Sequence, residues 1–158
     1  LNIYSKGFIE FVKLFRHLKG QSIGITAVAA GPYRKTSKCP DFFTKDFFDT
    51  LVEDFKSMGG VYIESTDPMS SLFYEEIKIF VFPSSFHGEA LPMVVLEAMV
   101  RGCYVYSKDI GFLKYHFNNK NLDVTFFDNP KKSEVEKILI DWDGYSAKNV
   151  NFILKGYS

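Results

Sequence analysis

Apolar side chains recur at helical spacing in two segments of the N-terminal half of the chain. The first segment runs from Phe8 to Gly20, and its apolar positions lie three or four residues apart, which predicts an amphipathic helix. The second follows Pro40 and closes at Met58-Gly59-Gly60, with an apolar face expected at Phe43, Phe47, Leu51, Val52 and Phe55. Glycine often follows the last turn of a helix, so both ends are well marked.

Short apolar runs alternate with the helical segments. The expected strands are residues 23–30, 61–64, 79–82, 103–106 and 124–127, and the further helices are 69–76, a segment beginning near Pro92 and ending at Arg101-Gly102, 134–140 and 147–154. Strands that alternate with helices of this length predict an α/β fold with a doubly wound parallel sheet and helices on both faces. At 158 residues the chain is long enough for one domain, which we assign to residues 1–158.

One carboxylate interrupts the longest apolar run of the chain, residues 91–100. Glu97 is the charged residue in that run, and Glu89 lies eight positions before it. A buried charge costs several kcal/mol unless it is paired, so Glu97 is expected to face a ligand or a cluster of donors. The alternative is a half-exposed Glu97 on a helix at the sheet edge, with Glu89 as an acid that complements the helix dipole.

Both carboxylates are expected close to the carboxyl end of a strand. The strand 79–82 leads into the turn 83–88, and Pro92 fits the first turn of the next helix, where its missing N–H is not needed. Ligands of open α/β sheets bind at the carboxyl ends of strands, and free N–H groups at a helix start attract anions. His87, in the same turn, is either a ligand contact or an ordinary loop histidine.

Lys6-Gly7 and Gly31-Pro32 are two further candidate ligand contacts. Lys6-Gly7 at a helix start would combine a positive charge with free N–H groups, although this pair also suits a solvated surface. Gly31-Pro32 after a strand leaves room for a ligand or is simply a turn. The sequence has no G-x-G-x-x-G, G-x-x-x-x-G-K-[ST] or G-x-S-x-G pattern, which argues against a Rossmann dehydrogenase, a P-loop NTPase and an α/β-hydrolase.

Charge and cysteine content exclude several other classes. Lysine and arginine together number 19, as do aspartate and glutamate, so the basic excess of nucleic-acid-binding proteins is lacking. Cys39, Cys103 and the three histidines show no metal-ligand spacing, and we expect reduced thiols in a cytoplasmic protein. The longest apolar run is too short to span a bilayer, and the first residues show no signal-peptide pattern.

Four segments, taken in chain order, carry a resemblance to a known family. They are Lys6-Gly7 before an aromatic-rich helix, Ala30-Gly31-Pro32, residues 80–84, and Gly88 to Met99 with the following Gly102. Together they cover nearly the whole chain and resemble the C-terminal, donor-binding lobe of retaining GT-B glycosyltransferases, in particular glycosyltransferase family 4 (glycosyl transferases group 1). Residues 88–99 are similar to the E-x7-E motif of that family in its proline-containing form.

The resemblance implies a Rossmann-like lobe that binds a nucleotide diphosphate sugar, such as a UDP or GDP sugar. In this reading Glu97 accepts hydrogen bonds from the ribose hydroxyls, a role that suits a carboxylate because both of its oxygens are acceptors. Glu89 contacts the donor sugar, and Lys6 binds the diphosphate and offsets charge on the leaving group. The other expected substrate-binding residues are Gly31, His87, Gly88, Ala90, Leu91 and Pro92.

The chain departs from the family pattern at three places. In the family an arginine upstream of the diphosphate lysine assists it, and no arginine precedes Lys6. Lys78 stands where an aspartate is frequent, and residues 112–115 replace the glutamate usual after Ile110-Gly111. We therefore expect the first strand of the lobe, its arginine and the whole N-terminal acceptor lobe to lie upstream.

The expected activity is sugar transfer to an acceptor hydroxyl with retention, in polysaccharide, lipopolysaccharide or other glycoconjugate synthesis. The glycan or glycolipid acceptor would bind through the missing lobe, which would also be the only route to the inner face of a membrane; the isolated lobe is expected to be inactive. No metal, other cofactor or nucleic acid is expected. A non-catalytic nucleotide-binding or scaffold domain remains an alternative, as does a nucleotide-sugar epimerase, although residues 96–99 favour a transferase.

Overall fold

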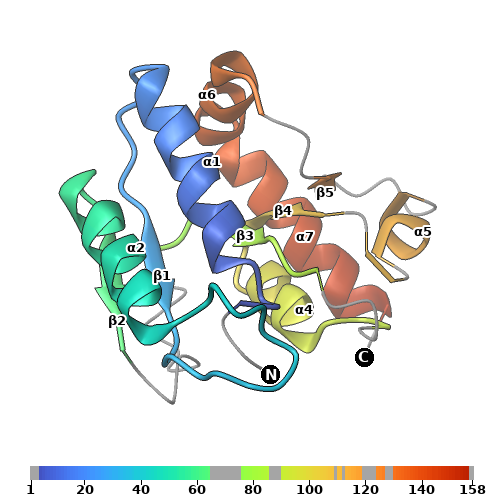
Figure 1. Cartoon of the computed structure of the whole chain (residues 1–158). Coiled ribbons are helices and arrows are strands. Elements are labelled where there is room, and N and C mark those ends of the chain that lie inside the picture. The colour runs from blue at the N-terminus through green and yellow to red at the C-terminus, as the bar shows by residue number, and fades with distance from the viewer. Residues whose placement is uncertain are drawn as a thin grey trace. The chain divides into compact units, whose positions relative to one another are not determined.

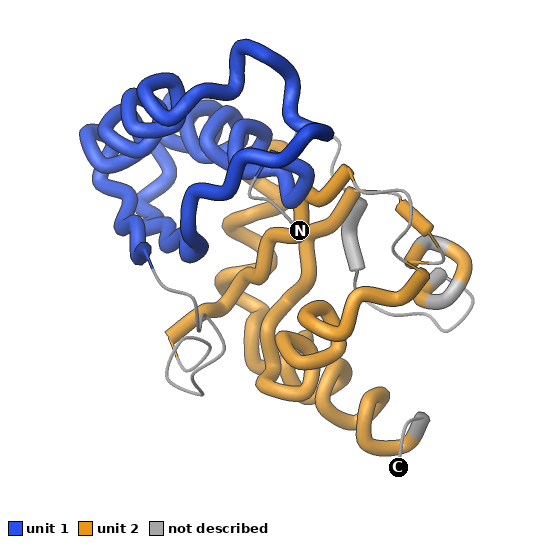
Figure 2. The backbone as a smooth tube through the Cα atoms, turned by 60° about the horizontal axis from the view of Figure 1, so that its bottom comes forward, with its two compact units in different colours: residues 1–68 blue, residues 69–158 orange. Residues whose placement is uncertain are grey.

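Helices and parallel strands alternate along the chain (Figure 1). The computed structural model describes residues 4–64, 76–85, 90–108, 110–111, 113–118, 124–126 and 130–156. The chain divides into two compact units, unit 1 (residues 1–68) and unit 2 (residues 69–158), coloured separately in Figure 2. Each unit is described by itself, and the assignment of residues 1–158 to one domain stays a prediction.

Within residues 4–64, unit 1 has two helices and a parallel pair of short strands. Its elements are α1 (Phe8–Gly20), β1 (Val28–Ala30), α2 (Lys45–Ser57) and β2 (Val61–Ile63). In the register of the two strands Ala29 lies opposite Tyr62. Aromatic rings dominate the core: Phe8, Phe15, Phe43, Phe48 and Phe55 are buried together with Val12 and Val52. Eight of the 17 phenylalanines of the chain lie in this unit, and five of them fill its core.

The first strand is shorter than the sequence predicted. Residues 23–30 were expected to form it, yet pairing with β2 begins only at Val28, opposite Val61. The preceding bond joins the amide of Val61 to the carbonyl of Ala27 at 2.8 Å. Among the described residues, none pairs with residues 23–26 as a neighbouring strand. The reason is that β2 begins only at Val61, directly after Gly60 and after Gly59, which has φ +86°.

The buried face of α2 also differs from the prediction. Phe48, Val52 and Phe55 are buried, whereas Phe47 is 37% exposed. Thr44 caps the helix, and its side chain accepts a hydrogen bond from the amide of Phe47 at 3.1 Å. The expected face was wrong at Phe47, since the stripe formed by Phe48, Val52 and Phe55 follows the helical spacing of four and three residues.

Unit 2 contains three parallel strands in the order β3-β4-β5. Its elements are β3 (Ile79–Phe82), α4 (Met93–Val100), β4 (Tyr104–Ser107), α5 (Leu113–Asn118), β5 (Val124–Phe126), α6 (Lys132–Ile140) and α7 (Trp142–Gly156). The parallel strands and their alternation with helices confirm the α/β fold class. The expected helix over residues 69–76 lies outside the described residues except for Glu76, which is in a turn.

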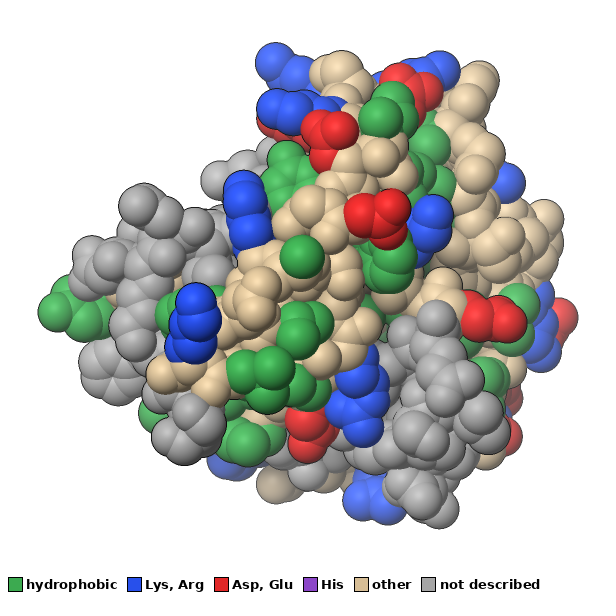
Figure 3. All heavy atoms as spheres, turned by 180° about the vertical axis from the view of Figure 1, so that it is seen from behind, with side chains coloured by type: hydrophobic (Ala, Val, Ile, Leu, Met, Phe, Trp, Pro, Cys, Tyr) green, Lys and Arg blue, Asp and Glu red, His purple; other side chains and the backbone are tan. Residues whose placement is uncertain are grey.

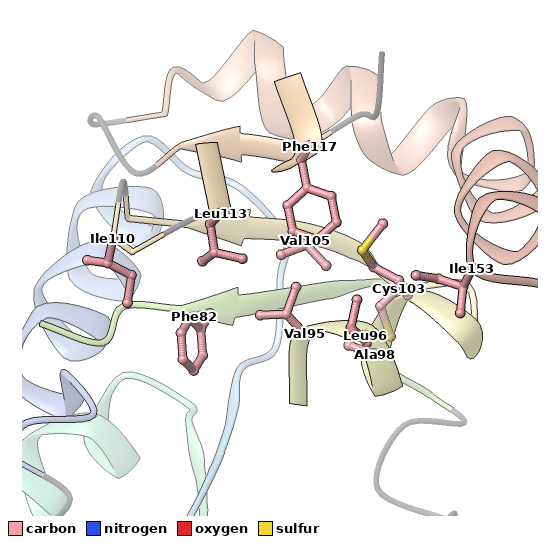
Figure 4. Close-up of a cluster of buried hydrophobic side chains, with 11 residues drawn as sticks. Phe82, Val95, Leu96, Ala98, Cys103, Val105, Ile110, Leu113, Phe117 and Ile153 are labelled. Atoms are coloured by element: carbon pink, nitrogen blue, oxygen red, sulfur yellow. The ribbon is translucent and has the colours of Figure 1, made fainter. Parts of the chain in front are cut away.

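The core of unit 2 forms around β3 and β4. Figure 4 shows Val95, Leu96 and Ala98 of α4 gathered with Cys103 and Val105. Leu113 and Phe117 of α5 and Ile153 of α7 complete the same cluster. The α4 helix is thus packed along one face, which fixes the rotation of the helix about its axis.

Several boundaries in unit 2 differ from the predicted ones. Helix α5 was not predicted at all, and α7 begins five residues earlier than the expected residue 147. Pro92 is the N-cap of α4, with φ −72° and ψ 118°, so it precedes the first helical turn and does not lie within it. Its extended backbone is compatible with the fixed φ of proline, and Met93 then begins the helix.

The surface mixes charges of both signs. On the face in Figure 3, lysine, arginine and acidic side chains are interspersed with hydrophobic ones, in keeping with a formal net charge of zero. None of the helices in the described ranges combines the length and apolar composition that crossing a membrane requires.

Candidate functional site

Glu97 carries an unusual feature for a helical carboxylate. Its side chain is half-buried overall, but its Oε2 atom is buried and has no hydrogen-bond partner among the residues that the structure describes. A buried polar atom without a partner costs about 1–3 kcal/mol. Such atoms are rare and often mark places where a ligand supplies the missing bond.

The packed helix around Glu97 fixes the position of its backbone. The residues on either side, Leu96 and Ala98, are 7% and 0% exposed. At the end of the helix the carbonyl of Ala98 accepts a hydrogen bond from the amide of Cys103 at 3.0 Å, and Arg101 Nη1 donates to the carbonyl of Glu97 at 3.3 Å. The backbone of Glu97 is therefore held in place by its neighbours, whereas no bond to Oε2 from the described residues restrains the carboxylate.

The start of α4 is suited to an anion. Ala90 is exposed, Leu91 half-buried and Pro92 buried. Pro92 makes no side-chain cap, and the first turn contains no acidic residue. The first N–H groups of a helix lack intrahelical partners and carry a partial positive charge, so this end favours a negatively charged group.

Buried serines line the carboxyl ends of the two strands beside α4. Ser84 follows β3 and Ser107 ends β4, and both are 0% exposed. The hydroxyl of Ser107 donates to the carbonyl of Lys108 at 2.9 Å. Neither serine was predicted as a site residue, and the available sequence signal for both was a serine after an apolar run.

His87, Gly88 and Glu89 lie outside the described residues, so their expected roles remain predictions.

In unit 1 the structure places Lys6-Gly7 at the start of α1, as predicted. Gly7 is the N-cap residue, with φ +82° and ψ 31°, a left-handed conformation that glycine adopts at little cost. Lys6 is half-buried immediately before it. The pair thus combines a cation with a helix start that has no side-chain cap.

Gly31 directly follows β1 and also has a backbone that favours glycine, with φ +141°. Its amide donates to the carbonyl of Ile63 at 3.1 Å, and its carbonyl accepts a hydrogen bond from the hydroxyl of Tyr62. Both backbone groups are therefore used by β2. Gly31 can contribute to a site through its small size and its turn, but its N–H is not available to a phosphate.

Aromatic rings bring the two candidate segments of unit 1 together. The ring of Tyr4, two residues before Lys6, lies 5.1 Å from that of Phe43. On the opposite side Tyr33, two residues after Gly31, stacks on Phe43 at 5.8 Å. The start of α1 and the loop after β1 consequently share one packed cluster.

Comparison with known families decides the family of the chain. The family described as "Glycosyl transferases group 1" matches residues 3–143, a range that includes Lys6, Gly31 and Glu97. The chain belongs to this family. No curated protein matches it closely enough to count as a relative.

Lys78, which departs from the glycosyltransferase pattern, has a local structural explanation. Its ammonium lies 5.5 Å from the centre of the Trp142 ring, and the indole Nε1 of Trp142 donates to the carbonyl of Lys78 at 3.2 Å. A cation is attracted to the face of an indole, whereas an aspartate would not be. In the second departing segment Leu113 is fully buried and Tyr115 is 73% exposed, and Phe112 lies outside the described residues.

The cysteines of this glycosyltransferase domain are free and buried. The thiol of Cys103 donates to the carbonyl of Ile77 at 3.1 Å, and burial raises the pKa of this thiol to about 11. His17 is exposed on α1. Across the described ranges, no group of three histidine, cysteine or acidic side chains is arranged to hold a metal ion.

Tyr62 is a residue of interest that the sequence did not predict. It is the middle residue of the three-residue strand β2, and it is half-buried between two exposed neighbours. Burial raises the pKa of its hydroxyl to about 12, so the group remains a hydrogen-bond donor to Gly31 at neutral pH. In the sequence, the sign that could have pointed to Tyr62 was a single polar aromatic residue between the apolar residues Val61 and Ile63.

Proposed function

We propose that the chain is the donor-binding lobe of a retaining glycosyltransferase of family 4 that uses a nucleotide diphosphate sugar. The family match supports transfer of a sugar in general, and the buried Oε2 of Glu97, which lacks a partner among the described residues, is the observation that carries the donor site. The donor's nucleotide would supply the hydrogen bond that this atom lacks within the described part of the chain.

Glu97 is proposed to bind the ribose. Two adjacent hydroxyls can each donate to one carboxylate oxygen, and a hydrogen bond to a charged group contributes about 1.5–3 kcal/mol. Because Leu96 and Ala98 hold the helix in the core, the backbone that carries this carboxylate does not have to be ordered when the donor binds.

The diphosphate is proposed to interact with Lys6 and with the helix starts. Lys6 supplies a positive charge directly before Gly7, and the start of α4 has neither an acid in its first turn nor a side-chain cap. An ammonium and unpaired N–H groups both stabilise phosphate oxygens. The same groups would offset the negative charge that builds on the diphosphate as it leaves.

The proposed reaction needs no nucleophile from the protein. The bond between the anomeric carbon and the diphosphate oxygen breaks, the acceptor oxygen bonds to that carbon from the same face, and the acceptor proton passes to the departing phosphate oxygen. Glu89 would orient the sugar and stabilise positive charge on it. Positioning and electrostatics would then account for the acceleration, and the proposal includes no metal ion.

The acceptor, a glycan or glycolipid, is proposed to bind an N-terminal lobe upstream of this chain. That lobe would also make any contact with the inner face of a membrane. In the described part of the chain, β3 has a strand neighbour on one side only, which is compatible with a further strand but does not by itself require one. On this proposal the 158-residue chain binds donor and transfers little or no sugar.

The test is a calorimetric or ligand-observed NMR titration with UDP, GDP, ADP and their sugars. We expect one nucleoside diphosphate to bind, and Glu97→Ala to weaken it by about tenfold or more. Glu136→Ala is the matched control, because Glu136 is an exposed helical acid on α6. Unchanged affinity in Glu97→Ala would refute the ribose assignment, and no binding to any nucleotide would favour a scaffold domain.

Lys6→Ala tests the diphosphate assignment separately. The loss of affinity should be large for the nucleoside diphosphate and small for the corresponding nucleoside, because only the former carries the charge that Lys6 would bind. Lys13→Ala, an exposed lysine on the same helix, is the control. Equal losses for both ligands would contradict the assignment.

A further inference from the structure

Tyr62 contacts both candidate segments of unit 1. Its hydroxyl donates to the carbonyl of Gly31, and the centre of its ring lies 5.5 Å from that of Phe8, the first residue of α1. Phe8 follows directly after Lys6-Gly7. One side chain therefore touches the turn after β1 and the helix start that carries the candidate cation.

We propose that Tyr62 is a positioning residue, which fixes the loop at Gly31 relative to Phe8 at the start of α1 and thereby restrains Lys6, two residues before Phe8. This inference rests on the proposed function, because it concerns the part of the donor site that binds the diphosphate. Tyr62 itself is not proposed to touch the donor.

The register of the two strands explains how Tyr62 reaches Gly31. Tyr62 lies opposite Ala29, whose small side chain leaves space for the ring, and the next pair is Ala30 with Ile63. Gly31 comes one residue later and also bonds to Ile63 through its amide at 3.1 Å. The hydroxyl of Tyr62 thus secures the other backbone group of the same glycine.

Exposure along β2 singles out Tyr62 as the inward-facing residue. Val61 and Ile63 are 47% and 41% exposed, so these two side chains contribute little to the interior. The ring of Tyr62 packs against Phe48 at 5.8 Å as well as against Phe8. Among the side chains of β2, that of Tyr62 is therefore the one that reaches the candidate site, beside the backbone bond from Gly31 to Ile63.

The Gly31 turn needs such a restraint. Its φ of +141° lies in a region that glycine reaches readily but also leaves readily. Two hydrogen bonds from β2 limit that freedom, one at the amide and one at the carbonyl. Removing the Tyr62 hydroxyl would free the carbonyl while the ring contacts with Phe8 and Phe48 remain.

The test compares Tyr62→Phe with Tyr33→Phe in the full chain. Tyr33 is a matched control, because it is also half-buried in the aromatic cluster and donates to a backbone carbonyl, that of Phe43 at 3.4 Å. UDP, GDP and ADP are titrated together with uridine, guanosine and adenosine. We expect Tyr62→Phe to weaken the diphosphate that binds by about fivefold, with the nucleoside unchanged, and Tyr33→Phe to change neither.

A double-mutant cycle with Lys6→Ala separates positioning from general destabilisation. If Tyr62 acts by placing Lys6, then Tyr62→Phe should cost little further affinity once Lys6 is alanine. Additive losses, or equal losses for nucleoside and diphosphate, would overturn the positioning role.

Amide hydrogen exchange in the ligand-free chain makes the inference independent of ligand choice. Exchange at Gly31 should be about tenfold faster in Tyr62→Phe than in wild type or Tyr33→Phe. Unchanged exchange at Gly31 would overturn the inference even if a nucleotide binds. If the Gly31 amide exchanges faster in Tyr62→Phe but the chain binds no nucleotide, the proposed function is refuted. Tyr62 would then have a role in folding only, and the inference would also be overturned.

Discussion

The side-chain amide of Asn149 in α7 donates a hydrogen bond to the backbone carbonyl of Cys103 at 2.8 Å. Cys103 precedes β4, its amide bonds to the end of α4, and its thiol bonds to Ile77 before β3. Asn149 therefore connects α7 to Cys103, a residue that also contacts α4, precedes β4 and bonds to the segment before β3.

Asn149→Ala should lower the free energy of unfolding by about 2 kcal/mol, because it leaves a buried carbonyl without its donor. Urea unfolding monitored by circular dichroism measures this change. Asn151→Ala, at an exposed position of the same helix, should stay within about 0.5 kcal/mol. Equal small effects of the two substitutions would show that the tie is not important for stability.

Gly102→Ala should be strongly destabilising. A β-carbon at Gly102 would lie 2.1 Å from the Oγ of Ser146, and φ is +82°. We expect a loss of at least about 2 kcal/mol. Adding Ser146→Ala should recover part of it, because the next atom, Ser146 Cβ, is 3.3 Å away.

Gly144→Ala is the control for this experiment, since no atom lies within 4 Å of the added carbon. It should be neutral or stabilise α7 by up to about 1 kcal/mol. A Gly102→Ala variant as stable as Gly144→Ala would contradict the close approach of α7 to this turn.

Glu97→Gln should stabilise the ligand-free chain while weakening donor binding. The buried Oε2 has no partner among the described residues, so removing its charge lowers a desolvation cost, and we expect a gain of about 1 kcal/mol. Thermal unfolding without nucleotide measures it. Glu136→Gln, at an exposed acid on α6, should change stability by less than about 0.5 kcal/mol; a destabilised Glu97→Gln would argue that the carboxylate has a structural partner.

Stability should fall in alkaline solution through Cys103. Because burial raises the pKa of its thiol to about 11, the folded state keeps the proton while an unfolded thiol with a pKa of about 8.5 loses it. The stabilising contribution of the protonated thiol is complete below about pH 8.5 and is lost between about pH 8.5 and pH 11, by on the order of 3 kcal/mol. Urea unfolding at pH 7.5 and 10.5 in reducing buffer measures it.

The difference between wild type and Cys103→Ala isolates this thiol from lysines and tyrosines that titrate in the same range. Cys103→Ala should be less stable at pH 7.5, and the gap should narrow at pH 10.5. A gap of constant size would contradict the raised pKa.

The α/β fold could be predicted from the sequence because apolar runs and helical repeats alternate clearly. α1 and β3 have the predicted bounds, and both are ended by strong local signals, Gly20 in one case and Pro83 in the other. Residues 23–27 read equally well as a strand, but strand formation depends on a partner, and β2 is only three residues long. The length of a strand that is set by a partner distant in the sequence cannot be read from the apolar pattern of the strand itself.

The candidate site was predicted unevenly for a similar reason. Glu97 stood out because a charge inside an apolar run conflicts with its surroundings; its side chain is half-buried, with Oε2 buried, and its role in a site stays a prediction. Gly31 was predicted to end its strand, and it follows β1 directly, but the sequence did not reveal that its N–H bonds to Ile63. Tyr62 was missed, because a tyrosine in a short strand suggests packing, and its hydrogen bond crosses 31 residues of sequence.

Trp142 gives the protein a built-in optical reporter. It is the sole tryptophan of the chain, and its indole is fixed by Lys78 through both a hydrogen bond and the ammonium above the ring. Intrinsic fluorescence excited at the indole band therefore follows unit 2 alone, whereas circular dichroism follows the helices of both units. Comparing the two signals during one denaturant titration would reveal whether residues 1–68 and 69–158 melt as one cooperative body or in separate steps.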